Sequence, residues 1–179
     1  TYGSAVLHMN LGAAHLIRSN LSSAETHLQA SAALFAQAGA EDFLPELERY
    51  QAEWQLQSGN IQQARQLCEQ ALLTAARQDA RAEAGITRRL LAHICIAEHN
   101  LVDAWNELER SLLILREVES RHEVARTQLV IAELAPQFGQ PEMAQQARQE
   151  AISILQELGV NYELEQSQQR ALALRNFEF

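Results

Sequence analysis

The feature that most constrains this sequence is a short corner that recurs every 40 residues. Each copy contains a turn, an Asn or Gln, then an apolar residue or proline, and an alanine three positions further on. The aligned positions are Asn20, Asn60, Asn100 and Gln140; Leu21, Ile61, Leu101 and Pro141; and Ala24, Ala64, Ala104 and Ala144. A fixed period in this range is typical of stacked repeats, in which each unit buries its apolar face against its neighbours.

The composition indicates that the repeated unit is helical. The 179 residues hold about four and a half units, and roughly three are needed for a stable stack. Aromatic residues are only 6% of the chain, and the mixture is rich in Ala, Leu, Gln and Glu, which favour helix. No strand-like alternation of useful length occurs. We therefore expect an all-α protein that folds as a single domain over residues 1–179.

The helical spacing of apolar residues predicts two helices in each unit. The predicted helices cover about residues 4–18, 21–38, 42–57, 61–78, 80–98, 101–118, 123–136 and 141–158. Asn20, Asn60 and Asn100 are predicted N-caps, whose side-chain oxygens accept an otherwise unpaired backbone N–H. Breaks at Gly39, Asp79, Glu119 and Gly159 give repeats of about 1–39, 40–79, 80–119 and 120–159. A further helix over 160–179 is either a cap on the stack or the first half of a fifth unit.

A second set of aligned positions, or columns, holds small residues. Gly12, Ala52, Ala92 and Ala132 lie 12 residues before the alanines of the corner. We expect the two helices of each hairpin to cross most closely there, because large side chains would hold them apart.

These columns resemble the tetratricopeptide repeat, a helical hairpin with the pattern W-x2-L-G-x2-Y in its first helix. The first repeat has this spacing at His8, Leu11, Gly12 and His15, with His at both aromatic places, and Ala24 follows as the small residue. The period of 40 instead of 34 implies longer helices, as in arrays of large bacterial signal-transduction ATPases and transcription regulators. The resemblance implies a right-handed α-solenoid of four hairpins plus a C-terminal helix.

In the repeat family the first helices line a concave groove that binds partners. The resemblance places six residues at groove-facing positions: Arg49, Glu53, Arg89, His93, Arg126 and Glu133. Because arginine pairs in a bidentate way with carboxylates and phosphates, an acidic side chain, a peptide C-terminus or an anionic small molecule is the expected ligand. The alternative for Arg49 and Glu53, which lie four residues apart, is an ion pair within one helix.

Other features argue against several classes of protein. The net charge of -9 argues against a surface for nucleic-acid phosphates. Cys68 and Cys95 lie within helical patterns and are expected to be buried, reduced thiols. The six histidines show no metal-ligand spacing, and no phosphate loop or nucleophile motif occurs. We therefore expect no metal, no cofactor and no catalytic activity.

The sequence also predicts where in the cell the protein is found. It shows no signal peptide and no apolar run long enough to span a membrane, which predicts a cytoplasmic protein. Its start in mid-pattern without Met suggests a part of a longer polypeptide.

The predicted function is a non-catalytic module that binds a protein or peptide within a larger bacterial regulatory protein. Two alternatives stay open. One is a small-molecule sensor arm of a transcription regulator. The other is a scaffold that binds a second copy of itself, or other domains of its own chain, through the ends of the stack, where Phe177 and Phe179 lie.

Overall fold

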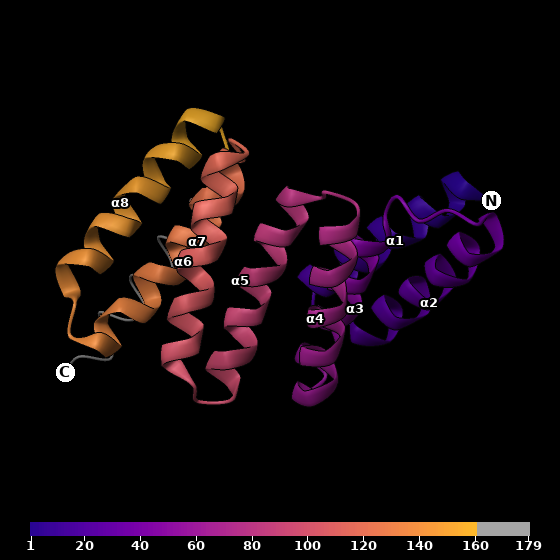
Figure 1. Ribbon diagram of the computed structural model, residues 1–179, viewed down its shortest axis with the longest axis horizontal. Helices are drawn as coiled ribbons and strands as arrows, with labels where there is room; N and C mark the ends of the chain where they lie inside the picture. Colours follow the sequence, from indigo (N-terminus) through magenta and orange to yellow (C-terminus); the bar gives the residue numbers. More distant parts are fainter. Residues whose placement is uncertain (161–179) are drawn as a thin grey trace. The chain divides into compact units, whose positions relative to one another are not determined.

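The computed structural model describes residues 1–160, which form eight α-helices and one short 3-10 helix and contain no strand. The helices are α1 (Tyr2–Ile17), α2 (Leu21–Ala38), α3 (Leu44–Gln57), α4 (Ile61–Arg77), α5 (Arg81–Ala97), α6 (Leu101–Glu117), α7 (Arg121–Leu134), η1 (Ala135–Phe138) and α8 (Pro141–Leu158) (Figure 1). Consecutive helices pair into four hairpins, α1 with α2, α3 with α4, α5 with α6 and α7 with α8. The prediction of an all-α protein built from four helical hairpins is confirmed.

Every break between consecutive helices, and the break after α8, contains one residue with a left-handed backbone. These residues are 20 apart along the chain, at Ser19, Gly39, Gly59, Asp79, His99, Glu119, Gly139 and Gly159. In each break the following residue donates its backbone N–H to the carbonyl five positions earlier, at 2.8–3.1 Å. This hydrogen bond ends the helix by pairing a carbonyl that has no partner within it. The corner within a hairpin and the break between hairpins therefore share one backbone conformation and one pattern of hydrogen bonds.

The three predicted asparagine caps differ in their hydrogen bonds. The Oδ1 atoms of Asn20 and Asn100 accept the backbone N–H three residues on, at 3.3 and 3.2 Å, as predicted. Asn60 occupies the same position, but its side chain makes no capping bond. Its Nδ2 instead donates to Oε1 of Gln55 at 2.8 Å. The capping prediction is wrong for Asn60, whose side chain is turned toward Gln55 of the preceding helix instead of toward the first turn of α4.

The small residues lie where the helices of a hairpin approach each other. A Cβ atom at Gly12 would lie 2.7 Å from Cδ2 of Leu28 on α2, so any side chain at this position would force the buried Leu28 to move. Five alanines of the two small columns in residues 1–114 are fully buried: Ala24, Ala52, Ala64, Ala92 and Ala104. The predicted close crossing is confirmed directly for α1 and α2.

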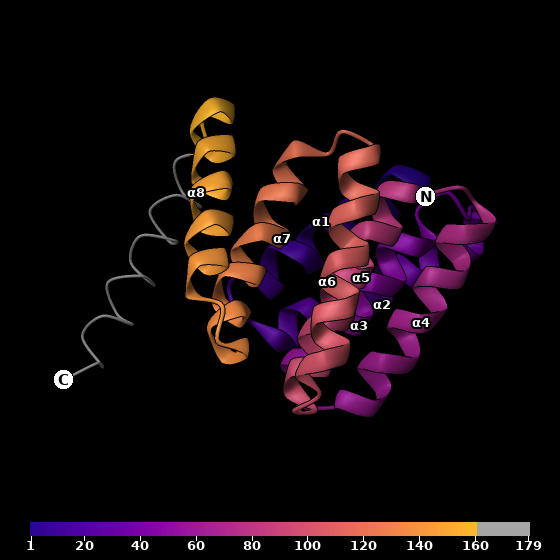
Figure 2. The ribbon, with the colours of Figure 1, turned by 60° about the vertical axis from the view of Figure 1, so that its left-hand side comes forward.

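Packing divides the chain into two compact units, the first covering Thr1–Ile114 and the second beginning at Leu115. In the first unit, one apolar cluster around Phe35 and Leu47 joins α1 and α2 to α3. Another, around Cys68 and Ile94, joins α3 and α4 to α5. Figure 2 shows the ribbons of these three helices. Both α3 and α5 also contact the first helix of the preceding hairpin. The first helices of the first unit are therefore neighbours.

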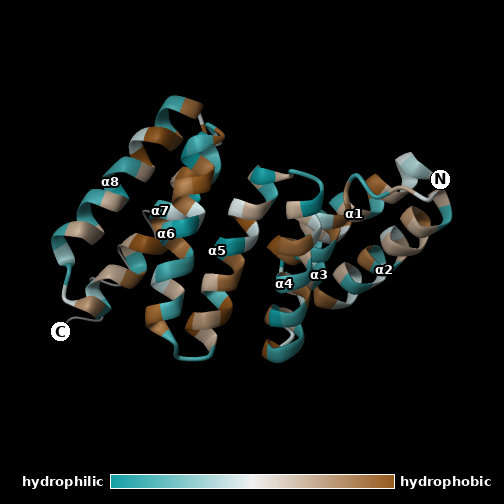
Figure 3. Cartoon of the chain, viewed as in Figure 1, coloured by the Kyte–Doolittle hydropathy of each residue, from teal (hydrophilic) through white to brown (hydrophobic). Residues whose placement is uncertain are grey.

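The helices are amphipathic, as the spacing predicts. Figure 3 shows hydrophilic and hydrophobic residues on different sides of helices such as α4 and α5. None of the helices in residues 1–160 combines the length and the apolar character needed to cross a membrane. The predicted terminal helix over 160–179, with Phe177 and Phe179, lies outside the described residues.

Candidate binding surface on the first helices

Four of the six predicted groove residues lie on neighbouring first helices of the first unit. Arg49 and Glu53 are on α3, and Arg89 and His93 are on α5. Helical spacing places Glu46 and Tyr50 on the same side of α3 as Arg49 and Glu53. We call these six residues the first-helix surface: Glu46, Arg49, Tyr50, Glu53, Arg89 and His93. The other two predicted residues, Arg126 and Glu133, are on α7 in the second unit.

Arg49 ties α3 to α5. Its side chain is buried, and its Nε donates to Oε2 of Glu83 on α5 at 2.8 Å. A terminal nitrogen lies 3.8 Å from Oε1 of Glu46, and the guanidinium carbon lies 4.1 Å from the ring centre of Tyr50. Two carboxylates and an aromatic face thus already compensate this charge. Arg49 does not form the ion pair with Glu53 that its spacing allows.

Glu46 is the weakly paired carboxylate of this group. Burial raises the pKa of Glu46, the nearby charge of Glu83 raises it further, and Arg49 partly offsets both effects. Because Arg49 is closer to Glu83 than to Glu46, Glu46 gains less from the guanidinium. The pKa of Glu46 therefore lies above the ordinary value of a glutamate.

The remaining three residues differ in exposure. Arg89 is buried, Glu53 is half-buried and His93 is exposed. Oε1 of Glu53 accepts a hydrogen bond from Nε2 of Gln57, one turn further along α3, at 3.3 Å. A partner approaching this surface can therefore reach Glu53 and His93, while the two arginines lie beneath them.

Arg126 and Glu133 are both exposed on α7. Nη1 of Arg126 lies 3.4 Å from Oε1 of Glu123, one turn earlier in the same helix. The two predicted residues are seven apart, so they lie about two turns from each other on the second unit.

One recurring set of contacts was not predicted from the sequence. In every hairpin a polar side chain of the first helix forms a hydrogen bond with a polar side chain of the second helix. The first-helix residues of these pairs are 40 positions apart in successive repeats. The pairs are His8 with His27 at 2.9 Å, Glu48 with Gln70 at 2.7 Å, Arg88 with Glu107 at 2.7 Å and Gln128 with Glu150 at 2.5 Å. The signal in the sequence is the column 8, 48, 88 and 128, which is polar in all four repeats but changes chemistry each time.

The first of these pairs belongs to a cluster of three imidazoles. The ring of His27 on α2 stacks on that of His15, with centroids 5.4 Å apart, and bonds to His8. Burial lowers the pKa of His27, and the two neighbouring rings lower it further. Sequence spacing placed only His8 and His15 on one face, because the contribution of α2 depends on how the hairpin closes.

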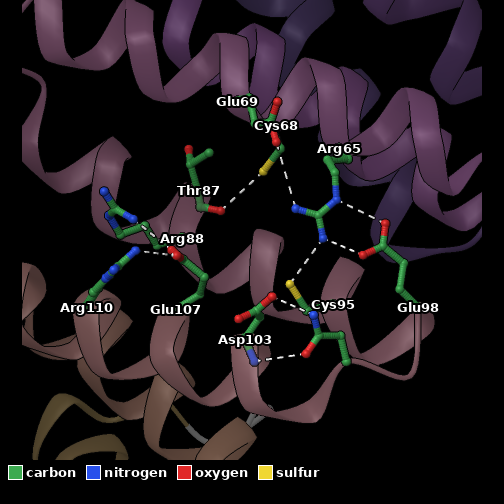
Figure 4. A network of polar contacts seen from close by, with 11 residues as sticks. Arg65, Cys68, Glu69, Thr87, Arg88, Cys95, Glu98, Asp103, Glu107 and Arg110 are labelled. Carbon is green, nitrogen blue, oxygen red and sulfur yellow. Dashed lines mark hydrogen bonds and ion pairs between the residues drawn. The ribbon is translucent and has the colours of Figure 1, made fainter.

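Arg65 connects α4 to α5 through a second polar group (Figure 4). Its guanidinium makes a two-pronged contact with Glu98, one bond being Nε to Oε1 at 3.0 Å, and also donates to Sγ of Cys95 at 3.3 Å. Cys68 lies deeper and donates to the carbonyl of Thr87 at 3.4 Å. Both cysteines are buried free thiols, as predicted, and burial raises the pKa of Cys68 to about 12.

No group of three or more His, Cys, Asp or Glu side chains among residues 1–160 has the geometry to hold a metal ion. The three clustered imidazoles are included in that statement. The described polar groups instead join helices to one another.

The fold is that of tetratricopeptide-like helical repeats, which confirms the resemblance seen in the sequence. No protein-family model matches the sequence, and no curated protein is significantly similar to it. The comparison with known proteins therefore rests on solved structures.

Three of these structures illustrate the similarity. BtubC (BKLC) from P. vanneervenii is 17% identical over 82% of this chain and 60% of its own, with a TM-score of 0.64. A signal-transduction ATPase with numerous domains and a tetratricopeptide repeat sensor, from Pyrococcus horikoshii, is 12% identical over 91% of this chain and 25% of its own, with a TM-score of 0.68. Kinesin light chain-like repeats from P. anserina are 17% identical over 98% of this chain and 97% of theirs, with a TM-score of 0.55. This chain thus spans less than two thirds of the first two proteins.

Proposed function

We propose that this chain is a non-catalytic module that binds a protein or peptide on its first-helix surface. The observation that carries the proposal is the bond between Arg49 and Glu83, which fixes the polar face of α3 beside that of α5. The exposed or half-buried side chains on these faces, Tyr50, Glu53 and His93, offer aromatic area and hydrogen-bonding groups from two helices. Surfaces built by repetition suit extended partners, because successive units present equivalent positions at regular intervals.

Arg49 and Arg89 have a different role in this proposal from that of Glu53 and His93. Both arginines are buried, and Arg49 already contacts Glu83 and Glu46. They hold the faces in place, and Glu53 and His93 meet the partner. On the second unit, Arg126 and Glu133 are the corresponding contact residues. We infer that the array serves a larger regulatory protein, since a similar array occurs in the Pyrococcus ATPase.

Selection from a random peptide library tests this proposal. The immobilised chain is used to enrich peptides, and their affinities are measured by fluorescence anisotropy for the parent and for a Glu53→Ala/His93→Ala variant. The matched control is Gln66→Ala/Glu69→Ala, which changes two exposed residues on the second helix α4. We expect the first variant to weaken binding by about tenfold or more and the control to leave it unchanged.

Two results would overturn the proposal. One is the failure of any peptide to enrich, and the other is equal loss of binding in both variants. The composition of the enriched peptides tests the expected acidic partner. Enrichment of Asp and Glu supports it, whereas enrichment of Lys and Arg shows that Glu46 and Glu53 dominate the surface.

The similarity to the repeat sensor of the Pyrococcus protein favours a second candidate function, the sensing of a small molecule. A ligand that binds only the folded chain raises its melting temperature by mass action. Thermal melts with a panel of phosphorylated sugars and dicarboxylates test this function. We expect a dose-dependent rise that is lost in His93→Ala, and no rise with any compound would remove the sensor hypothesis.

A further inference from the structure

Three imidazoles form a proton-sensitive contact between the two helices of the first hairpin. Nδ1 of His8 on α1 lies 2.9 Å from Nδ1 of His27 on α2, within hydrogen-bonding distance. This bond occupies the place at which the other three hairpins of the described chain are joined by Glu, Gln and Arg side chains. Glutamine does not titrate, and the ordinary pKa values of Glu and Arg lie outside the range between about pH 5 and 8, whereas that of histidine lies within it. The first hairpin therefore has a polar contact that titrates near neutral pH.

The number of protons on the two rings decides whether they can bond. A neutral imidazole has one N–H donor and one acceptor nitrogen, whereas a protonated imidazole has only donors. Two neutral rings bond when the Nδ1–H of one donates to the bare Nδ1 of the other, and a protonated ring donates to a neutral one in the same way. Two protonated rings cannot bond, because both Nδ1 atoms then carry hydrogen and both rings are positive. The second proton therefore breaks the contact between His8 and His27.

His15 adds to the cost of charging this pair. Its ring is stacked on that of His27, with the ring planes 7° apart and the centroids at 5.4 Å. Burial lowers the pKa of His27 below its ordinary value of 6.5, and the charges of His8 and His15 lower it further. A histidine whose pKa is lowered by folding adds stability that is complete above its ordinary pKa and is lost as the pH falls below that value. Acid therefore weakens this hairpin, beginning near pH 6.5.

Among residues 1–160, no carboxylate bonds to any of the three histidines, so none offsets their protonation. Helix α1 contains no Asp, Glu, Lys or Arg, and Arg18 directly after it is a cation. Glu25 on α2 accepts a hydrogen bond from Gln29. Helix α3 packs against both α1 and α2, and its titratable side chains have partners elsewhere. They are Glu46, Arg49 and Tyr50, which contact one another, Glu48, which bonds to Gln70, and Glu53, which bonds to Gln57.

We propose that His8, His15 and His27 form a pH switch that closes the first hairpin at neutral pH and loosens it in mild acid. All three rings belong to α1 and α2, so the switch needs no segment outside these two helices. An apolar cluster around Phe35 and Leu47 joins both helices to α3, so loosening the hairpin also weakens the packing of α3. The switch is independent of whether the first-helix surface binds a partner.

Amide hydrogen exchange of the full chain at about pH 7.5 and about pH 5.0, read by mass spectrometry and corrected for the intrinsic rates, tests the switch. An opening that takes up one proton becomes about tenfold more favourable for each pH unit in the range where that proton binds. We therefore expect protection of α1 and α2 to fall by about tenfold or more in acid, while protection of α5 keeps its value. Equal loss in α5 would show general destabilisation by acid and overturn the proposal, as would unchanged protection of α1 and α2.

Two variants separate the histidine contact from other effects of acid. His8→Gln introduces the residue type of Gln128, which occupies the same column in the fourth hairpin, and an amide can bond to a neutral or a protonated ring. His27→Leu introduces the residue type of Leu67, its counterpart in the second hairpin, and removes the ring that His8 and His15 share. We expect both variants to keep their protection in acid.

The matched control is His99→Asn, which removes an exposed histidine from the break after α5 and introduces a residue that tolerates the left-handed backbone. We expect it to lose protection in acid like the parent. Circular dichroism verifies that each protein is folded, and His8→Gln decides the question if His27→Leu fails to fold. Loss of protection that persists in the folded cluster variants overturns the switch, because other groups then respond to the protons.

Discussion

At the scale of single residues, the left-handed positions of the corners are the most sensitive points of the backbone. Four of them are glycine and four are Ser19, Asp79, His99 and Glu119, with φ between 52° and 60°. Side chains destabilise this conformation by about 1–2 kcal/mol, because Cβ crowds the backbone. The fold therefore carries four positions at which a change to glycine relieves strain.

We expect His99→Gly to raise the free energy of unfolding by about 0.5–1 kcal/mol, since relieved strain exceeds the entropy that glycine adds to the unfolded chain. Gly59→Ala should lower it by about 1–2 kcal/mol. Ser58→Gly is the control, because Ser58 has φ of −80° and has no strain to relieve. Urea titrations measure all three, and a gain at Ser58 as large as that at His99 would refute the strain argument.

The Cys68 thiol gives a second prediction at this scale. Its burial raises its pKa to about 12, so almost no thiolate exists near neutral pH. We expect it to react with a thiol reagent such as DTNB only on unfolding, with a rate that follows urea concentration. Fast labelling of Cys68 in the native protein, located by mass spectrometry, would show that α4 and α5 open locally around it.

At the scale of helix pairs, the approach of α1 and α2 depends on Gly12. Alanine favours a helix by about 1 kcal/mol over glycine, but the added Cβ would lie 2.7 Å from Leu28. Overpacking of this kind costs about 1–3 kcal/mol, so we expect Gly12→Ala to destabilise the protein. Gly3→Ala in the same helix meets nothing within 4 Å and should stabilise it. Thermal melts distinguish the two, and stabilisation by both changes would contradict the close crossing.

The bond between Arg65 and Glu98 gives the junction of α4 and α5 a pH dependence. The hydrogen bonds from Arg65 hold the pKa of Glu98 below its ordinary value of 4.5. Glu98 therefore adds stability above pH 4.5, and this stability is lost as the pH falls through its folded pKa. We expect Glu98→Gln to destabilise the protein by at most about 1 kcal/mol at pH 7, and we expect this deficit to shrink as the pH falls through the folded pKa of Glu98.

Glu69→Gln is the control for this prediction, because Glu69 also neighbours Arg65 but lies 3.8 Å away on an exposed site. Urea titrations at several pH values compare the three proteins. A deficit of Glu98→Gln that stays constant as the pH falls below 4.5 would mean that the glutamine disturbs packing rather than removing an ion pair.

The sequence predicted the helices well because their signals are local. The corner residues and the apolar spacing placed all eight helices to within about two residues, except that α7 ends at Leu134 and continues as η1 around Pro136. Side-chain partners were harder to predict. The partner of Arg49 is Glu83 on the next hairpin, 34 residues away, and not Glu53 on its own helix. Such pairs depend on how hairpins stack, which helical spacing does not contain.

At the scale of the whole molecule, the 40-residue period produces equivalent positions that serve different purposes. The column that holds Leu47 seals a hairpin in the middle of the first unit and is exposed at Leu7. The polar column at 8, 48, 88 and 128 joins every hairpin with a different pair of side chains. Repetition thus fixes the architecture, and the identity of the side chain in each column decides which surfaces remain for partners.

The most direct measurement is amide hydrogen exchange of the chain with and without an enriched peptide, read by mass spectrometry. We expect slower exchange in α3 (Leu44–Gln57) and α5 (Arg81–Ala97) on binding, with α4 and α6 unchanged. Protection confined to α4 and α6 would show that the partner binds the second helices, and the first-helix surface would then have no part in recognition.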